Sequence, residues 1–112
     1  MSDIQPATES KPLLEILKNM PTTKDGILSK IPLQTKAFQL THLALAQGQS
    51  IATHTSPDMV VVTLLSGDLL FTVDTTQYQM HAGDSIYLAP DAPHSLYANA
   101  DSCLQLVMMH TA

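Results

Sequence analysis

The sequence predicts an all-β domain, an antiparallel sandwich or barrel, and three observations support this fold class. From Ile27 onward, short runs of β-branched and apolar residues recur along the chain. Turn-forming Gly, Pro, Asp and Asn residues separate the runs, so strands are expected at spacings of about 8–12 residues without helices between them. The 112 residues suffice for one core and are too few for two domains of ordinary size.

The first 26 residues are expected to form an N-terminal arm with a short helix, and residues 27–112 a single β-barrel domain. The first dozen residues are polar, and Ser10 is placed to cap a helix that has Pro12 in its first turn. Pro21 is expected to end this helix. Its apolar residues fall on one face at helical spacing and would cover one end of the barrel: Leu13, Leu14, Leu17 and Met20.

Strands are then expected in five parts of the domain. They cover residues 38–46, 60–65, 69–73, 85–88 and 104–109. Aspartates lie at or next to most of the turns between these runs, where an Asp side chain can bond its own backbone. This regular alternation of short strands and turns is what indicates a sandwich or barrel.

Two of these strands are apolar on both faces. Residues 60–65 hardly alternate, and residues 104–109 do not alternate apart from Gln105. A barrel strand in a monomer alternates between inside and outside, so the outer face of these strands requires a cover. A second sheet, the N-terminal segment or another subunit would each provide one. Only 13% of the residues are charged, against about 25% in ordinary globular proteins, and we therefore expect a homodimer packed sheet on sheet.

The charges are divided unevenly along the chain. All five lysines lie within the first 36 residues, and there is no arginine. Residues 37–112 carry six aspartates and no Lys or Arg, which gives that stretch a charge of -6. Nucleic-acid binding needs basic residues to neutralise phosphates, so no nucleic-acid partner is expected. Without arginine the chain also lacks the planar fork that captures carboxylates and phosphates, which disfavours an anionic sugar-nucleotide substrate.

Cysteine content and the absence of targeting patterns predict a cytoplasmic protein. Cys103 is the only cysteine, which excludes an intramolecular disulfide and a zinc site with several cysteine ligands. We expect it to be a buried, inert thiol. Residues 1–6 lack the start of a signal peptide, and no apolar run approaches the roughly 18 residues that span a bilayer, so no membrane partner is expected.

Two of the five histidines lie in segments with a recognisable pattern. His54 lies in GQSIATHTSPDMV, which begins at Gly48, and Gly67 follows after six more residues. His94 ends the segment GDSIYLAPDAPH, which begins at Gly83. These segments resemble the two motifs of the cupin superfamily, the small barrels also called RmlC-like. The first cupin motif is a glycine, five residues, His-x-His, three residues, a glutamate, six residues and a glycine. The second is Gly-Asp, an apolar strand, a Pro-rich turn and a histidine.

The resemblance covers about residues 38–109 and implies the cupin double-stranded β-helix, a jelly-roll barrel, here with a short N-terminal helix. The chain looks most like short single-domain bacterial cupins, a group generally described only by its fold. By resemblance, His54 and His94 face each other across the barrel mouth. The family's metal ligands are the two histidines and the glutamate of the first motif and the histidine of the second. Here Ser56 takes the second histidine position and Val60 the glutamate position, while Asp91 takes a usual glycine position of the second motif.

These departures leave the metal site incomplete. Iron, manganese, nickel or zinc needs about three or four donors, and two histidines with water predict weak or partial occupancy. His42 and His110 are further candidates, each on condition that its strand face points into the barrel. Without a metal, His54 and His94 would hydrogen-bond to water, Ser56 or a polar ligand. His81 is expected at the surface.

Three functions remain open, and no catalytic residue is assigned. The first is a binding module whose barrel holds a small uncharged, apolar or cationic molecule. The second is a metal-dependent dioxygenase or isomerase that uses His54 and His94, as the family's activities imply. The third is a sensor or interaction domain. The residues expected to line the pocket are Ser56, Val60, Met108 and His110.

Overall fold

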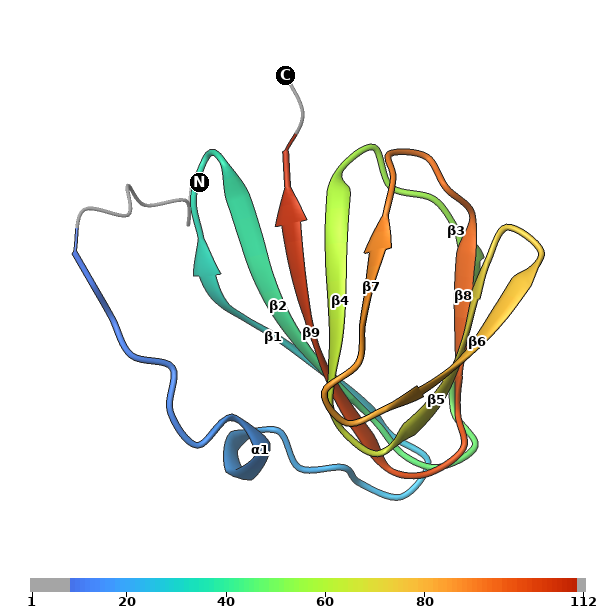
Figure 1. Ribbon diagram of the computed structural model, residues 1–112. Coiled ribbons are helices and arrows are strands. Elements are labelled where there is room, and N and C mark those ends of the chain that lie inside the picture. The colour runs from blue at the N-terminus through green and yellow to red at the C-terminus, as the bar shows by residue number, and fades with distance from the viewer. Residues whose placement is uncertain (1–8, 111–112) are drawn as a thin grey trace.

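Two antiparallel β-sheets face each other in the computed structural model, which describes residues 9–110 (Figure 1). Sheet A has the strand order β1-β2-β9-β4-β7, and sheet B has the order β3-β8-β5-β6. The strands are β1 (Ile27–Gln34), β2 (Phe38–Leu45), β3 (Ser50–His54), β4 (Met59–Ser66), β5 (Asp68–Val73), β6 (Thr76–His81), β7 (Ser85–Leu88), β8 (His94–Ala98) and β9 (Ser102–Met109). The predicted all-β jelly-roll barrel is confirmed.

Each of the five expected strands is present, and their ends differ by at most two residues. Strands β1, β3, β6 and β8 were not expected from the sequence, and three of them, β1, β3 and β6, form sheet edges. An edge strand buries less of its surface, so its sequence needs fewer apolar residues. Strand β6 illustrates the effect, because Met80 is its one buried residue.

The N-terminal helix is shorter than expected. Helix α1 spans Ile16–Asn19, and Glu15 precedes it with a left-handed backbone (φ 53°) and no side-chain cap hydrogen bond. The expected cap at Ser10 was therefore wrong, because the turn at Glu15 separates the helix from the residues before it. Residues 1–8 of the predicted arm lie outside the described residues. No helix among residues 9–110 is long and apolar enough to cross a membrane.

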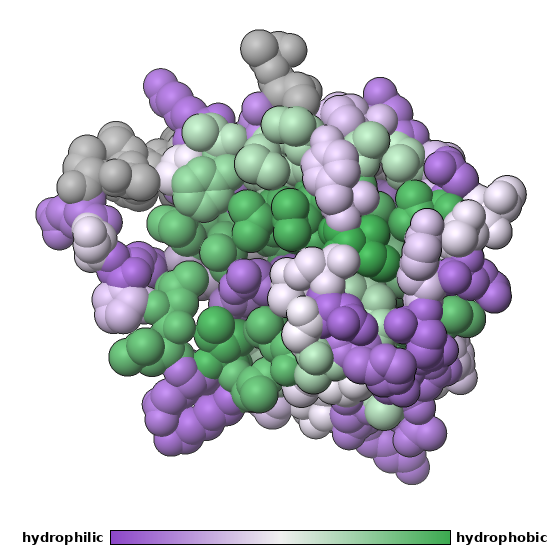
Figure 2. Space-filling model, in the orientation of Figure 1, coloured by the Kyte–Doolittle hydropathy of each residue, from purple (hydrophilic) through white to green (hydrophobic). Residues whose placement is uncertain are grey.

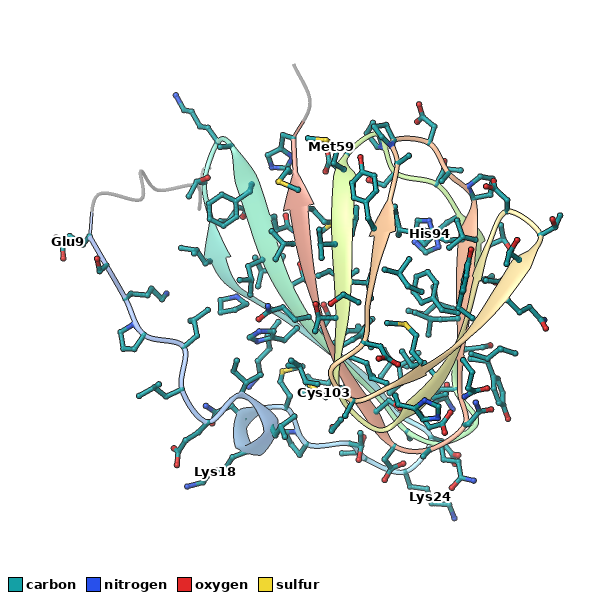
Figure 3. The ribbon with its side chains drawn as sticks, in the orientation of Figure 1. Glu9, Lys18, Lys24, Met59, His94 and Cys103 are labelled. Carbon is teal, nitrogen blue, oxygen red and sulfur yellow. The ribbon has the colours of Figure 1, made fainter. Side chains whose placement is uncertain are left out.

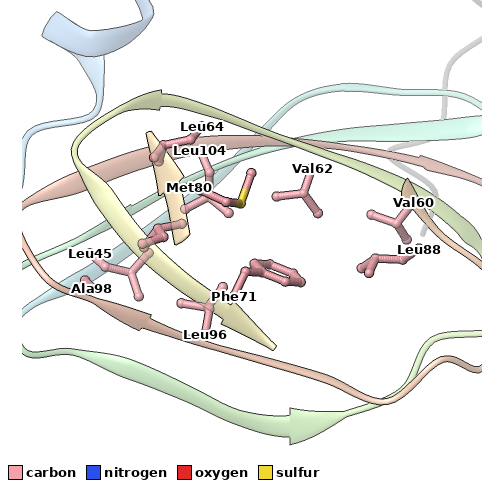
Figure 4. Packing of buried hydrophobic residues seen from close by; sticks show 11 residues of the cluster. Leu45, Val60, Val62, Leu64, Phe71, Met80, Leu88, Leu96, Ala98 and Leu104 are labelled. Atoms are coloured by element: carbon pink, nitrogen blue, oxygen red, sulfur yellow. The ribbon is translucent and has the colours of Figure 1, made fainter. Parts of the chain in front are cut away.

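The core fills the space between the sheets (Figure 4). Alternation along β4 and β9 points the even-numbered residues inward, among them Leu104, Leu106 and Met108 of β9. Each fully buried Leu or Phe side chain contributes about 1.5–3 kcal/mol to stability. The buried members of this cluster are Leu45, Val60, Val62, Leu64, Leu69, Phe71, Met80, Leu88, Leu96, Ala98 and Leu104.

A second, smaller cluster lies on the outer face of sheet A. Met20, at the end of α1, packs there with Ala44 of β2 and Cys103 of β9. The N-terminal segment therefore covers one part of the outer face, as one of the sequence-based alternatives proposed. Cys103 is buried as expected, and burial raises the pKa of its thiol.

Candidate ligand site at the barrel mouth

His54 and His94 come together at one end of sheet B. His54 ends β3, His94 begins β8, and the two residues are direct cross-strand partners. Their ring centroids are 4.2 Å apart with an interplanar angle of 63°. The expectation that they face each other across the mouth was wrong, because they stand side by side on neighbouring strands. Figure 3 shows the His94 ring projecting from β8 into the space between the sheets.

Each of the two imidazoles makes the same kind of contact, with the backbone carbonyl two residues before it. Nδ1 of His54 lies 2.9 Å from the carbonyl oxygen of Ala52, and Nδ1 of His94 lies 2.9 Å from that of Ala92. A carbonyl oxygen only accepts hydrogen bonds, so each Nδ1 carries a proton and donates. In the neutral ring the other nitrogen, Nε2, then offers a lone pair. The site therefore presents two adjacent acceptors, which cannot bond each other.

The surroundings of His94 are apolar and rigid. The Phe71 ring, which is fully buried, stacks on the His94 ring at a centroid distance of 6.1 Å and an interplanar angle of 8°. Phe71 comes from β5, so the contact fixes the imidazole against the core. Preorganised side chains lose less conformational freedom when they bind a ligand.

The predicted pocket residues occupy different positions around this end of the barrel. Val60 is buried in the core, and its cross-strand partner Met108 is half-buried against it. Ser56 lies in the β3–β4 loop, where its hydroxyl accepts a hydrogen bond from the Asp58 amide at 3.2 Å. His110 follows β9 and is exposed at the rim, where its Nδ1 donates to the Asp58 carboxylate at 3.2 Å.

The loops that carry the two histidines are tied together. The Asp91 amide, in the β7–β8 loop, donates to the Ser56 carbonyl in the β3–β4 loop at 2.8 Å. Asp91 itself has φ 66°, in the left-handed region that favours glycine. Because Asp tolerates this conformation better than most residues, it can occupy a position where the resembled motif has glycine.

Two of the five histidines lie away from the mouth. His42 points to the outer face of sheet A, where it is buried and donates from Nε2 to Gln105 Oε1 at 3.0 Å. It lines a cavity of about 240 Å³ between the N-terminal segment and sheet A, together with Met20 and Lys30. His42 therefore does not complete a ligand set with His54. His81 is exposed, as expected, near Asp68 and Asp84.

The donor set at the mouth does not fit a resident divalent metal. Protein metal sites use three or four side-chain ligands, and here two imidazoles are present. Among residues 9–110, no group of three or more His, Cys, Asp or Glu side chains is arranged to hold a metal ion. Ser56 and Val60 stand where the resemblance would put the other ligands.

Two features of the site could not be found from the sequence. One is the pair of carbonyl contacts at Ala52 and Ala92, which lie two residues before each histidine. The equal spacing is visible in the sequence, but the contact depends on loop conformation. The other is the Asp58–His110 pair, which requires the register of β4 against β9.

Comparisons with known proteins agree with this architecture. The family model of the cupin domain matches residues 41–110. A conserved protein of unknown function from Streptococcus pyogenes is 30% identical, with a TM-score of 0.85 over 100% of this chain and 97% of that one. No curated protein sequence gives a significant match.

More distant structures share the fold. A cupin superfamily protein from Desulfitobacterium hafniense is 14% identical, with a TM-score of 0.83 over 98% of this chain and all 100% of that one. An RmlC-like cupin from Shewanella frigidimarina is 16% identical, with a TM-score of 0.74 over 78% of each chain. At these identities the likeness concerns the fold alone.

Proposed function

The chain belongs to the cupin family, and we propose that its barrel mouth binds a small, mostly apolar molecule that carries a hydroxyl or an amino group. The observation that carries this proposal is the matched pair of Nδ1 contacts on His54 and His94. They leave one Nε2 acceptor on each of two neighbouring rings. A hydroxyl, with its single proton, can donate to one of them, and an ammonium group can donate to both. A hydroxyl or ammonium donor there takes the place of water and adds a directed hydrogen bond to the apolar contacts of the ligand.

The walls and charges around the pair support the same class of ligand. Met108 is half-buried and supplies apolar surface, while Phe71 and Val60 are buried behind it, and small-molecule sites are typically apolar with a few placed polar groups. The loops next to the two histidines, β3–β4, β5–β6 and β7–β8, carry the charged residues Asp58, Asp74 and Asp91 and no Lys or Arg. Acidic neighbours repel a carboxylate and tolerate an alcohol or an ammonium group.

A binding series with matched headgroups tests the proposal. Primary alcohols, amines and carboxylates of one chain length are titrated while the ring ¹⁵N resonances of all the histidines are followed by NMR. We expect alcohols and amines to shift His54 and His94, and carboxylates to leave them unchanged. Binding should be lost in the His54→Ala, His94→Ala double variant and kept in His81→Ala, which removes an exposed imidazole elsewhere. Equal binding of carboxylates, or full binding by the double variant, would contradict the proposal.

A metal-dependent activity is the second candidate, because the two free Nε2 atoms are also the atoms that a divalent cation takes. Elemental analysis of untagged protein separates the two candidates. Clearly sub-stoichiometric metal in both the wild type and the double variant supports the ligand-binding proposal. Near one metal per chain, abolished in the double variant, would overturn it in favour of a dioxygenase or isomerase.

A further inference from the structure

A row of polar side chains crosses the outer face of sheet A. Lys30 of β1 pairs with His42 of β2, and His42 pairs with Gln105 of β9. The row continues through Thr63 of β4 to Ser85 of β7. Residues directly opposite each other on neighbouring strands point to the same face, so these five side chains are neighbours. Figure 2 shows hydrophobic side chains over the strands of sheet A and beside α1, with hydrophilic side chains between the two groups.

The hydrogen bonds within this row leave one acceptor of His42 without a partner. Thr63 Oγ1 lies 2.8 Å from Ser85 Oγ, and His42 Nε2 donates to Gln105 Oε1 at 3.0 Å. Since Nε2 carries the proton of the neutral ring, Nδ1 offers a lone pair. The bond to Gln105 is the only hydrogen bond of this imidazole within residues 9–110.

The free Nδ1 atom of His42 faces the cavity of about 240 Å³ between the N-terminal segment and sheet A, which we call the arm cavity. His42 is only 5% exposed, and it lines this cavity. Among the described residues, no fully buried side-chain nitrogen or oxygen atom lacks a hydrogen-bond partner. Because Nδ1 has no partner, it keeps some accessible surface, and on so buried a residue that surface belongs to the cavity wall.

The rest of the arm cavity combines apolar walls with positive charge at its rim. Lys30 Nζ donates to the carbonyl oxygen of Asn19 at 2.8 Å, and Lys11 Nζ donates to that of Pro32 at 2.8 Å. Asn19, Lys30 and Pro32 line the cavity, and each ammonium group has three protons, so both retain donors for a ligand. The apolar lining residues are Leu13, Leu14, Ile16, Met20 and Pro32.

We propose that the arm cavity binds a small phenol, whose hydroxyl donates to His42 Nδ1 and accepts from Lys30 Nζ. Lys30 and His42 are direct cross-strand partners with Cβ atoms about 5 Å apart, so one oxygen atom can reach both side chains. An apolar cavity of about 150 Å³ holds benzene, so the arm cavity has room for a substituted ring. The Met20 thioether in its wall is a favourable contact for an aromatic ring.

Other headgroups fit this pair of side chains less well. A carboxylate only accepts hydrogen bonds, so it would place a second acceptor against His42 Nδ1. An ammonium group would meet the charges of Lys30 and Lys11, while the carboxylate of Glu15 already pairs with Lys18 at 3.9 Å. An aliphatic alcohol has the same donor and acceptor as a phenol, but the phenol is the stronger acid and therefore the stronger donor. The site is separate from the barrel mouth, whose two histidines belong to sheet B.

A titration with 4-methylphenol, followed by NMR of the histidine ring ¹⁵N resonances, tests the proposal. We expect a saturable shift of His42 in the wild type and in the His54→Ala, His94→Ala double variant. Toluene, 4-methylbenzoate and 4-methylbenzylammonium have a similar ring and should bind about tenfold more weakly, the factor that one hydrogen bond contributes. An unchanged His42 resonance, or equal affinity for toluene, would overturn the proposal. A shift confined to His54 and His94 would overturn it as well, while supporting the ligand proposed for the barrel mouth.

Substitutions of the two headgroup partners complete the test. Lys30→Met keeps the aliphatic stem and removes the ammonium group, so the affinity for 4-methylphenol should fall about tenfold. Lys11→Met is the matched control and should keep the wild-type affinity, because Lys11 also bonds one carbonyl at 2.8 Å but does not line the cavity. His42→Leu should bind toluene and 4-methylphenol equally. Equal losses in the two lysine variants would overturn the proposed contact, and this comparison is decisive even if His42→Leu is too unstable to study.

Discussion

Gly67 and Ser102 are packed so closely that no side chain fits between them. A Cβ atom at residue 67 would overlap Ser102 Oγ and lie 2.6 Å from Ser102 Cα, in a turn where Gly67 has φ +103°. The same Ser102 hydroxyl accepts a hydrogen bond from the Asp68 amide at 3.1 Å. This contact joins the β4–β5 turn to the start of β9.

Gly67→Ala should therefore lower the free energy of unfolding by about 3 kcal/mol, since backbone strain and a steric clash act together. Gly83→Ala is the matched control. Gly83 also has a positive φ, +95°, but a Cβ atom at this residue would meet nothing within 4 Å. Its free energy of unfolding should fall only by the cost of backbone strain, about 1 kcal/mol. Urea denaturation measures both values, and equal losses would show that packing against Ser102 is unimportant.

The stability of the protein should rise when Asp91 is replaced by glycine and fall when it is replaced by alanine. Its φ of 66° lies in the left-handed region, which raises the conformational energy of any residue with a Cβ atom. The polar side chain of Asp lowers that energy by local hydrogen bonding, and alanine has no such side chain. We expect Asp91→Gly to be more stable than Asp91→Ala by about 1 kcal/mol in thermal or urea unfolding. The reverse order would mean that the β7–β8 loop does not keep this conformation in solution.

The His42–Gln105 pair should behave as a coupled unit. His42 is buried and lines the cavity under the N-terminal segment, Gln105 is half-buried beside it, and their contact is 3.0 Å long. Removing one partner leaves the other buried without its hydrogen bond, at a cost of about 1–3 kcal/mol. A double-mutant cycle with His42→Leu and Gln105→Leu should show a combined loss clearly smaller than the sum of the single losses. Strict additivity would indicate that the two residues do not interact, and His81→Leu serves as an exposed control with little effect.

Stability should fall at alkaline pH because of Cys103. Burial raises the pKa of this thiol above its ordinary value of 9.0. The unfolded chain then loses the thiol proton at a pH where the folded chain still holds it. The contribution of the Cys103 thiol to the free energy of unfolding is therefore complete below pH 9.0. It declines as pH rises toward the pKa of the thiol in the folded state. Chemical denaturation from pH 8 to 10.5, compared with Cys103→Ala, measures this. If the stability of Cys103→Ala falls with pH as steeply as that of the wild type above about pH 9, the decline comes from the tyrosines and lysines instead.

Runs of apolar and β-branched residues predict most of the strands correctly, whereas β8, an interior strand of sheet B that begins with His94 and Ser95, was missed because its sequence lacks such a run. Strands β4 and β9 were predicted within two residues, because they lie inside sheet A and consist almost entirely of apolar residues. Strands β3 and β6 form the edges of sheet B and are largely exposed, so hydrogen bonding to a neighbour rather than composition makes them strands.

The candidate site could be predicted in its identity but not in its geometry. The spacing of the two motifs pointed to His54 and His94, and the structure brings their rings together. The orientation of His42 and His110 could not be decided, because a shift of one residue in strand register exchanges the two faces. The tautomer of each mouth imidazole depends on a loop carbonyl, which no local sequence pattern encodes.

Because every lysine lies within the first 36 residues and there is no arginine, trypsin can cut this chain only in its N-terminal third. The bond after Lys11 precedes a proline and resists cleavage, which leaves Lys18 and Lys24 as the exposed targets ahead of the first strand. Residues 37–112 contain no cleavage site even when unfolded. Lys36 is exposed as well, in the turn between β1 and β2, so a brief digestion of the native protein can leave fragments that start at Asp25 or at Ala37. The mass in solution of the fragment that starts at Asp25 would tell whether the exposed leucines of the arm, Leu14 and Leu17, contribute to self-association.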